Sequence, residues 1–182
     1  MSADTVTLSP GTGFDPGGIG KGLAADILVT ELRAAGADGA LVSLGGDVRV
    51  AGVAPEGGGW TVGVAHPWDG VDLAPLGVAD GAVATSSVLR RRWERGGELR
   101  HHLIDPRTGR PSDTRLVQAT VVAATGWQAE VLAKAVLING DAHPFDILGG
   151  IGAEGLAVSA DGTVLVSPGL APFLGTKVLE LA

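Results

Sequence analysis

Cysteine and tyrosine are absent from this sequence, which has only 3 phenylalanines and 4 tryptophans among 182 residues. The lack of cysteine excludes disulfide bonds, thiolate metal ligands and cysteine nucleophiles. Because aromatic side chains are scarce, the hydrophobic core has to be built from Ala, Val, Leu and Ile, which the hydrophobic content of 45% supplies. Any chemistry therefore rests on oxygen, imidazole, ammonium and guanidinium groups.

Long apolar runs are also missing. No stretch approaches the roughly 20 apolar residues of a membrane-spanning helix, and residues 1–4 lack the basic and apolar segments of a signal peptide. We therefore expect no membrane insertion and, by default, a cytoplasmic protein. The net charge of −7 argues against nucleic acid as a partner. One basic cluster is the exception, and an alternating exposed strand explains it more simply: Arg90, Arg91, Arg92, Arg95 and Arg100.

Glycine is abundant, with 30 residues spread among apolar segments, which predicts tight turns rather than disorder. Helical spacing predicts helices over Ile19–Ala35 and Trp127–Ile138, the second with Thr125 as its N-cap. Strands are predicted at Ala40–Leu44, Val48–Val53, Trp60–Ala65, Ala82–Ser86, Leu89–Trp93, His101–Ile104, Gln118–Ala123, Gly155–Ser159 and Thr163–Val166. Together they predict an α+β fold in one domain, residues 1–182, with mixed or antiparallel sheets packed against two main helices.

The run from His101 to Gly109 contains two imidazoles, a carboxylate and a guanidinium, and it closes with residues that turn the backbone. An apolar pair between the second imidazole and the carboxylate suggests a buried strand that delivers polar groups to a loop, where functional residues concentrate. Taken alone, the run is explained as well by an ordinary hairpin with a solvated Arg107 and a turn-capping Asp105.

A second run, Asp15-Pro-Gly-Gly-Ile-Gly-Lys-Gly-Leu-Ala-Ala-Asp26, leads into the first predicted helix. Its glycines expose backbone amides at the positive end of the helix dipole, a site for phosphate or another anion, and Lys21 adds a point charge. The run fits neither the Walker pattern nor GxGxxG. A tight turn whose glycines permit positive φ or close packing also explains it.

In order with Ser43-Leu-Gly-Gly-Asp47, Ala84-Thr-Ser-Ser87 and Ala129-Glu-Val-Leu-Ala-Lys134, the two runs are far more specific. From about Phe14 to about Leu148 the sequence resembles the FAD:protein FMN transferases, the ApbE-like flavin transferases. Their signatures look like DxGGIGKGxAxD, xGGD, ATS(G) and HxIDPRTGxP, followed by a helix that opens with an acidic residue. The resemblance implies an enzyme that moves FMN from FAD to a Thr or Ser hydroxyl of a partner flavoprotein through a phosphodiester linkage.

The resemblance also implies where the nucleotide binds. The residues that match the phosphate segment or offer binding groups are Gly17, Gly18, Gly20, Lys21, Asp47, Thr85, Ser86 and Thr108. A turn-capping role explains Asp47 as readily.

The candidate catalytic residues are His102, Asp105 and Arg107. His102 matches a histidine thought to transfer a proton or position the substrate, and a neutral imidazole suits a base for a threonine hydroxyl. Asp105 and Arg107 would orient the loop and contact phosphate oxygens. A local pair that holds the turn explains them too, and both roles can hold together. Strand alternation should turn His101 away from the site.

The second predicted helix departs from the family pattern. Relatives place Asp there, followed four residues later by Thr or Ser, and these side chains bind Mg²⁺ together with a carbonyl of the glycine run, matched here by Gly18. This sequence has Glu130 and Lys134, and a protonated lysine has only donors. Three explanations stay open: an ordinary helix-surface pair, Mg²⁺ held by Glu130 with phosphates and water, or the Lys134 ammonium in place of the metal.

Only fourteen residues precede Asp15, where family members carry a substantial segment that contributes to the flavin pocket. A truncated chain, a second chain that supplies the missing N-terminal half, and a degenerate homologue all explain this. The alternative to an active transferase is therefore an incomplete or inactive homologue that binds a flavin nucleotide or depends on a partner.

Overall fold

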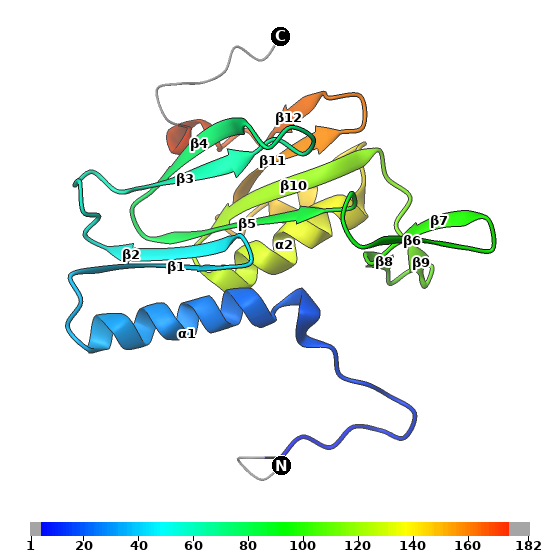
Figure 1. Cartoon of the computed structure of the whole chain (residues 1–182), viewed down its shortest axis with the longest axis horizontal. Coiled ribbons are helices and arrows are strands. Elements are labelled where there is room, and N and C mark those ends of the chain that lie inside the picture. Colours follow the sequence, from blue (N-terminus) through cyan, green and yellow to red (C-terminus); the bar gives the residue numbers. More distant parts are fainter. Residues whose placement is uncertain (1–4, 175–182) are drawn as a thin grey trace.

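The structure is a computed structural model that describes residues 5–174. Its centre is a six-stranded antiparallel sheet in the order β1-β2-β5-β10-β11-β12. These strands are β1 (Gly39–Leu44), β2 (Asp47–Gly52), β5 (Gly81–Ser87), β10 (Leu116–Ala123), β11 (Glu154–Ser159) and β12 (Val164–Val166). Helix α2 (Gly126–Asn139) packs on this sheet, and α1 (Gly20–Ala34) packs beside α2 and along β1 and β2 (Figure 1).

Three hairpins surround the central sheet within the described residues. They are β3 (Trp60–Ala65) with β4 (Asp72–Val78), β6 (Arg92–Arg95) with β7 (Glu98–His101), and β8 (Ile104–Asp105) with β9 (Arg110–Pro111). Short 3₁₀ turns lie at η1 (Pro16–Gly18), η2 (Asp146–Leu148) and η3 (Ala171–Phe173). Antiparallel sheets against two main helices confirm the predicted α+β class.

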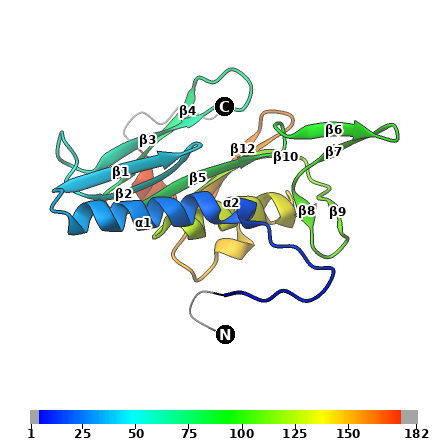
Figure 2. The same ribbon diagram turned by 60° about the horizontal axis from the view of Figure 1, so that its bottom comes forward.

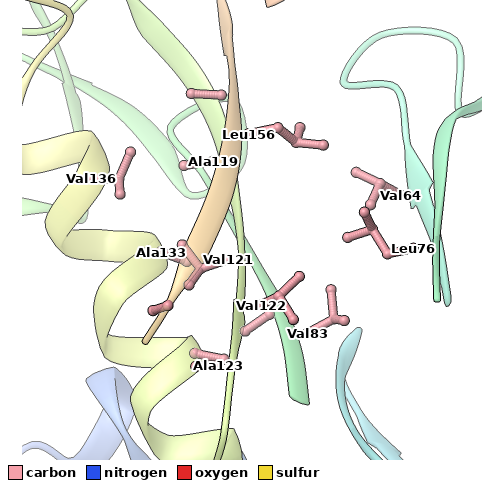
Figure 3. Packing of buried hydrophobic residues seen from close by; sticks show 14 of the residues in the cluster. Val64, Leu76, Val83, Ala119, Val121, Val122, Ala123, Ala133, Val136 and Leu156 are labelled. Carbon is pink, nitrogen blue, oxygen red and sulfur yellow. The ribbon is translucent and has the colours of Figure 1, made fainter. Parts of the chain in front are cut away.

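Strand β10 is buried along its whole length because both of its faces are covered. Val121 points toward Ala133 of α2, whereas Val122 points to the other side, toward Val64 and Leu76 of the β3–β4 hairpin (Figure 3). Side chains alternate between the faces of a strand, so a single strand can serve both layers. The core therefore lies on both faces of β10, and α2 is fixed against it.

The two helices cross at their backbones. A Cβ atom on Gly22 would collide with the carbonyl of Gly126, and one on Gly126 would meet the carbonyl of Gly22. The buried stripe of α1 is accordingly made of small residues, namely Gly22, Ala25 and Val29. The larger apolar residues that predicted this helix flank the stripe and are 41–50% exposed: Leu23, Ile27, Leu28 and Leu32.

Both predicted helices are confirmed, but the cap of the second differs from the prediction. Thr125 occupies the N-cap position with extended backbone, yet its hydroxyl makes no capping bond and contacts Gln128 Oε1 at 2.9 Å. The first amides of α2 instead donate to the carboxylate of Asp26, from the middle of α1. The sequence pattern predicted the start of α2 correctly. It did not predict that the cap comes from Asp26 of α1.

Two strand predictions are wrong. The chain bends at residues 89–91, where Arg91 has a φ of 54°, so the strand predicted at Leu89–Trp93 begins only at Arg92. The strand predicted at His101–Ile104 is interrupted, because β7 ends at His101 and β8 begins at Ile104. Strand β4 was not predicted, and its Pro75 is accepted because a two-stranded hairpin does not require every amide to donate.

The arginine cluster lies around the β6–β7 hairpin, which projects beyond the end of the central sheet (Figures 1 and 2). All four residues of β6 are exposed, as the exposed-strand interpretation predicted for Arg92 and Arg95, whereas Arg90 and Arg91 lie in the bend before the strand. Arg92 Nε donates to the carbonyl of Val88 at 2.6 Å, and Arg100 pairs with Glu98. Among residues 5–174, no helix combines the length and apolar character needed to cross a membrane.

Candidate functional site

Four charged side chains meet where the glycine run, the β1–β2 turn and α2 come together. Glu130 of α2 is only 1% exposed and faces the start of α1. It accepts a hydrogen bond from the amide of Gly22 at 2.8 Å and contacts the ammonium groups of Lys134 at 3.0 Å and Lys21 at 3.2 Å. Burial alone raises a carboxyl pKa, but the Gly22 amide and the two lysines outweigh it and lower the pKa of Glu130.

Lys21 lies between two carboxylates, because its ammonium also contacts Asp47 in a short ion pair. Asp47 follows the Gly45–Gly46 turn and is 3% exposed. Burial opposes the charge on Lys21, yet Asp47 and Glu130 together raise its pKa. Asp47 therefore neutralises Lys21, a role that neither the turn-cap nor the nucleotide-contact interpretation had assigned.

Lys134 joins α2 to the glycine run. Its Nζ donates to the carbonyl of Gly18 at 3.2 Å, to the carbonyl of Glu130 at 3.2 Å and to Glu130 Oε1 at 3.0 Å. Burial lowers the pKa of Lys134, and Glu130 partly offsets that effect. The Glu130–Lys134 pair is thus not an ordinary surface pair, because one partner is buried and the other reaches a segment 116 residues away.

The anion-binding end of α1 is already used by the protein itself. The sequence predicted that the glycine run and Lys21 bind a phosphate. In the structure, the Gly22 amide and the Lys21 ammonium both bind carboxylates of this chain. The outer residues of the motif are structural as well: Asp15 Oδ1 accepts from the amide of Gly17 at 2.8 Å. The motif therefore builds the junction between α1 and α2 through contacts within the chain.

Asp26, the last residue of that motif, holds the start of α2. Its carboxylate accepts from the amides of Gly126 at 2.7 Å and Trp127 at 3.0 Å, and Arg49 Nε pairs with it at 3.1 Å. Sequence reasoning missed this role, because a residue in mid-helix gives no sign of capping a distant helix. The available signal was the motif itself, in which an acidic residue recurs eleven positions after Asp15.

The loop after β8 is held by its own polar groups. Arg107 Nε lies 3.0 Å from Asp105 Oδ1 and its Nη2 3.0 Å from Oδ2, while the Arg107 amide donates to Oδ1 at 2.8 Å. These bonds lower the pKa of Asp105. The Thr108 hydroxyl lies 3.4 Å from the Asp105 carbonyl and accepts from the Arg110 amide at 3.2 Å. The structure thus contains an Asp105–Arg107 pair that holds the turn, as one of the two interpretations of the sequence predicted.

The two histidines differ in their surroundings. His101 Nε2 lies 3.1 Å from the carbonyl of Ser112, and its Nδ1 accepts from the amide of Leu103 at 3.3 Å. Within residues 5–174, the buried Nδ1 of His102 has no hydrogen-bond partner. Burial, followed by the charges of Arg91, His101 and Lys134, lowers the pKa of His102. His102 is therefore the histidine that remains uncommitted.

The structure does not bring every candidate residue together. Thr85 shares its strand face with Val83, on the β3–β4 side of the sheet, and its hydroxyl lies 2.8 Å from that of Thr120. Ser86 alternates to the α2 side and is 9% exposed. An open, mainly apolar pocket of about 300 Å³ lies between the loop and α2, lined by residues 105–107, Ala135, Ile138, Asn139 and Ile147.

The oxygen atoms around Lys134 do not form a site for Mg²⁺. Among the described residues, no group of three or more His, Cys, Asp or Glu side chains could hold a metal ion. The two oxygens that the sequence assigned to the metal, the Gly18 carbonyl and the Glu130 carboxylate, both accept from Lys134. Mg²⁺ needs a near-octahedral set of oxygens, which this cluster does not offer.

An antiparallel sheet on two helices, with a glycine run bound to an acidic helix residue, defines the class: an α+β protein whose candidate site lies where the helices cross. Residues 2–153 match the sequence model of the ApbE family, and the chain belongs to this family.

Similar proteins agree with this assignment. An FAD:protein FMN transferase of Escherichia coli (strain K12) is 32% identical over 142 residues, which are 77% of this chain and 40% of the relative. One from Treponema pallidum (strain Nichols) is 34% identical over 179 residues, 91% of this chain and 49% of the relative. The crystal structure of the ApbE protein from Thermotoga maritima matches with a TM-score of 0.77 and 28% identity, covering 87% of this chain and 52% of that one. The flavin transferase ApbE from Vibrio cholerae matches with a TM-score of 0.73 and 28% identity, covering 88% and 52%. The chain thus spans about half or less of the length of these relatives.

Proposed function

We propose that this chain acts as the C-terminal portion of an FAD:protein FMN transferase, which binds FAD and moves FMN to a Thr or Ser hydroxyl of a partner flavoprotein. The observation that carries the proposal is the junction of the glycine run with the acidic helix residue, Gly18 to Lys134 and Gly22 to Glu130. The names of the Escherichia coli and Treponema pallidum relatives support the reaction class. Residues 1–182 would work as one unit.

The proposed reaction is a phosphoryl transfer. The hydroxyl oxygen of the acceptor attacks the FMN phosphorus of FAD, a new phosphodiester bond forms, and the pyrophosphate bond breaks so that AMP leaves with the bonding electron pair. His102 is proposed to accept the hydroxyl proton. Its lowered pKa supports this role, because a base must be unprotonated at neutral pH.

The cations near the glycine run are proposed to stabilise the negative charge of the transferred group. Phosphoryl transfer is catalysed mainly by positioning and by charge neutralisation. Lys21 and Arg107 are the proposed contacts for phosphate oxygens, and Asp105 orients Arg107. Gly17, Gly20, Ser86 and Thr108 are proposed to bind the nucleotide. Thr85 has weaker support, since it lies on the β3–β4 side of the sheet.

Completion of the pocket by further polypeptide is also part of the proposal. The aligned region is 40% of the Escherichia coli relative and 49% of the Treponema pallidum relative, and α1 carries four apolar side chains that are 41–50% exposed. A second chain, or another part of the same protein, is proposed to contact these residues. The alternative function, an incomplete or inactive homologue that binds a flavin nucleotide, rests on the same observations and on the changed Glu130–Lys134 pair.

A chimera distinguishes these functions. Residues 14–148 would replace the aligned part of the Escherichia coli relative, and transfer would be followed as flavin fluorescence on an acceptor protein after denaturing electrophoresis. We expect the acceptor to become fluorescent only with FAD present. A folded chimera that binds FAD but leaves the acceptor dark would support the inactive homologue instead.

A further inference from the structure

The ammonium of Lys134 has all of its hydrogens committed inside the protein. An ammonium has three donors, and Nζ has three acceptors at 3.0–3.2 Å: the Gly18 carbonyl, the Glu130 carbonyl and Glu130 Oε1. The side chain is only 18% exposed. Lys134 therefore has no donor left for a ligand, and its effect on a ligand acts through its charge and through the segment that it holds.

The oxygens around Nζ come from two distant segments. Gly18 ends the η1 turn and Glu130 lies on α2, 112 positions later in the sequence. One cationic centre thus bridges a backbone carbonyl of the glycine run and a buried carboxylate of the helix. This bridging is the function that a bound divalent cation would otherwise perform.

A divalent cation does not fit beside this ammonium. An ion bonded to both oxygens would lie about 2.0–2.1 Å from each, and Lys134 would have to leave the acceptors that stabilise its buried charge. The cluster is also balanced, with two ammonium groups (Lys21 and Lys134) against two carboxylates (Asp47 and Glu130). A dication would leave it with an excess of positive charge around Glu130, which is only 1% exposed.

We propose that Lys134 is a resident cation that clamps the glycine run to α2 and makes the nucleotide site of this chain independent of divalent metal. Lys134 is a positioning residue, since it acts through Gly18 and Glu130. The role in nucleotide binding rests on the proposed function, whereas the absence of metal binding does not.

The first test measures metal binding directly on the 182-residue chain. Mn²⁺ is titrated as an electron paramagnetic resonance probe, and thermal unfolding is followed in Mg²⁺ and in EDTA. We expect the wild type to leave Mn²⁺ free and to unfold at the same midpoint in both solutions. Stoichiometric Mn²⁺ binding, or a midpoint raised by Mg²⁺, would overturn the proposal without any variant being needed.

The second test converts the clamp into a metal site. Lys134→Thr removes the ammonium and adds an oxygen four residues after Glu130. We expect a lower midpoint than wild type in EDTA, recovered by about 5–10 °C when Mg²⁺ is about 100-fold above its dissociation constant. Lys134→Arg keeps the charge and should show no Mg²⁺ response. Arg115→Thr, which breaks the exposed Arg115–Asp161 pair, is the matched control and should also show none.

A folded Lys134→Thr protein whose unfolding midpoint is the same in Mg²⁺ and in EDTA would contradict the proposal that the ammonium takes the place of a divalent cation. ADP titration of the chimera, in which further polypeptide completes the pocket, separates this inference from the proposed function. Equal ADP affinity of the chimera with Lys134 in Mg²⁺ and EDTA supports metal-independent binding, and affinity that is lost in EDTA overturns it. If ADP does not bind to the chimera in either solution, the proposed function is contradicted, while the Mn²⁺ result still decides the inference on Lys134.

Discussion

At the scale of single residues, His101 and His102 are adjacent but have different partners. His101 is tied to Ser112 and Leu103 through both ring nitrogens, whereas the Nδ1 of His102 is buried without a partner among the described residues. In the chimera, His102→Ala should lower flavin transfer by roughly 10²–10⁴-fold. FAD affinity should change little, because base catalysis acts in the transition state.

His101→Ala is the matched control for that change. It should lower the stability of the β7–β8 segment and reduce transfer much less than His102→Ala does. Rates from flavin fluorescence and affinities from calorimetry measure both variants. Equal losses at the two histidines, or a pure loss of affinity at His102, would assign His102 a structural or binding role.

With His102 as the proposed base, the pH dependence of transfer by the chimera is expected to follow from the surroundings of His102. Burial comes first and the charge of Arg91 second among the causes that lower the pKa of His102 from 6.5. A base with a lowered pKa stays unprotonated to lower pH. The midpoint of the acidic limb in the pH profile of kcat/KM should therefore lie below pH 6.5. Arg91→Gly fits the backbone φ of 54° and should move that limb upward.

Arg95→Gly, on the exposed strand β6, serves as the charge-loss control and should leave the limb in place. A limb that is unchanged in Arg91→Gly would show that this arginine does not act on the titrating group.

At the scale of elements, the contact between the two helices depends on Asp26 and on glycine. Asp26→Ala leaves two α2 amides without their acceptor and removes one of the two carboxylates that pair with Arg49. We expect a loss of about 2 kcal/mol in the free energy of unfolding, the upper end for a helix cap. Urea unfolding measures it. Thr125→Ala is the control and should change little, since the Thr125 hydroxyl does not cap the helix.

Gly22→Ala tests the helix crossing itself. The new methyl group would collide with the Gly126 carbonyl, so we expect a destabilisation of about 1–3 kcal/mol, typical of overpacking. Gly20→Ala is the matched control, because its Cβ would meet only Pro16 Cβ at 3.6 Å. It should be neutral or stabilising by up to about 1 kcal/mol. Equal unfolding free energies for the two variants would refute a close helix crossing.

Local patterns predicted the elements whose signals are local. The strand at Trp60–Ala65 was predicted because its alternation of side chains lies within a few positions. The predictions failed where a distant segment decides the outcome. The cap of α2 comes from α1, and the acceptor of Lys134 comes from the glycine run, so neither could be inferred from its own neighbourhood.

At the scale of the whole molecule, the fold and the family were predictable, but the pairing of charged and polar groups within the site was not. The order of the motifs predicted the residues that meet near α2. It did not predict that Lys21 and the Gly22 amide bind Asp47 and Glu130 of the same chain. A motif specifies which residues are present, whereas their pairing depends on distances that only the folded chain fixes.

The length of this chain, compared with that of its relatives, predicts how well the isolated 182-residue chain binds FAD. It spans 40% of the Escherichia coli protein, and apolar side chains on α1 are open to solvent. We expect the 182-residue chain to bind FAD weakly or not at all by isothermal titration. Sub-micromolar binding would show that no further polypeptide is needed to complete the pocket.

The close approach of Gly22 and Gly126 has a consequence for how the protein acquires its site. Asp26 and the Gly126 amide that it binds are 100 positions apart, and contacts between such distant residues form slowly because a long loop must close first. During synthesis, α1 emerges long before α2 exists. The helix junction therefore cannot form on a nascent chain until α2 has left the ribosome, whereas the Lys21–Asp47 pair, whose partners are 26 positions apart, does not depend on α2.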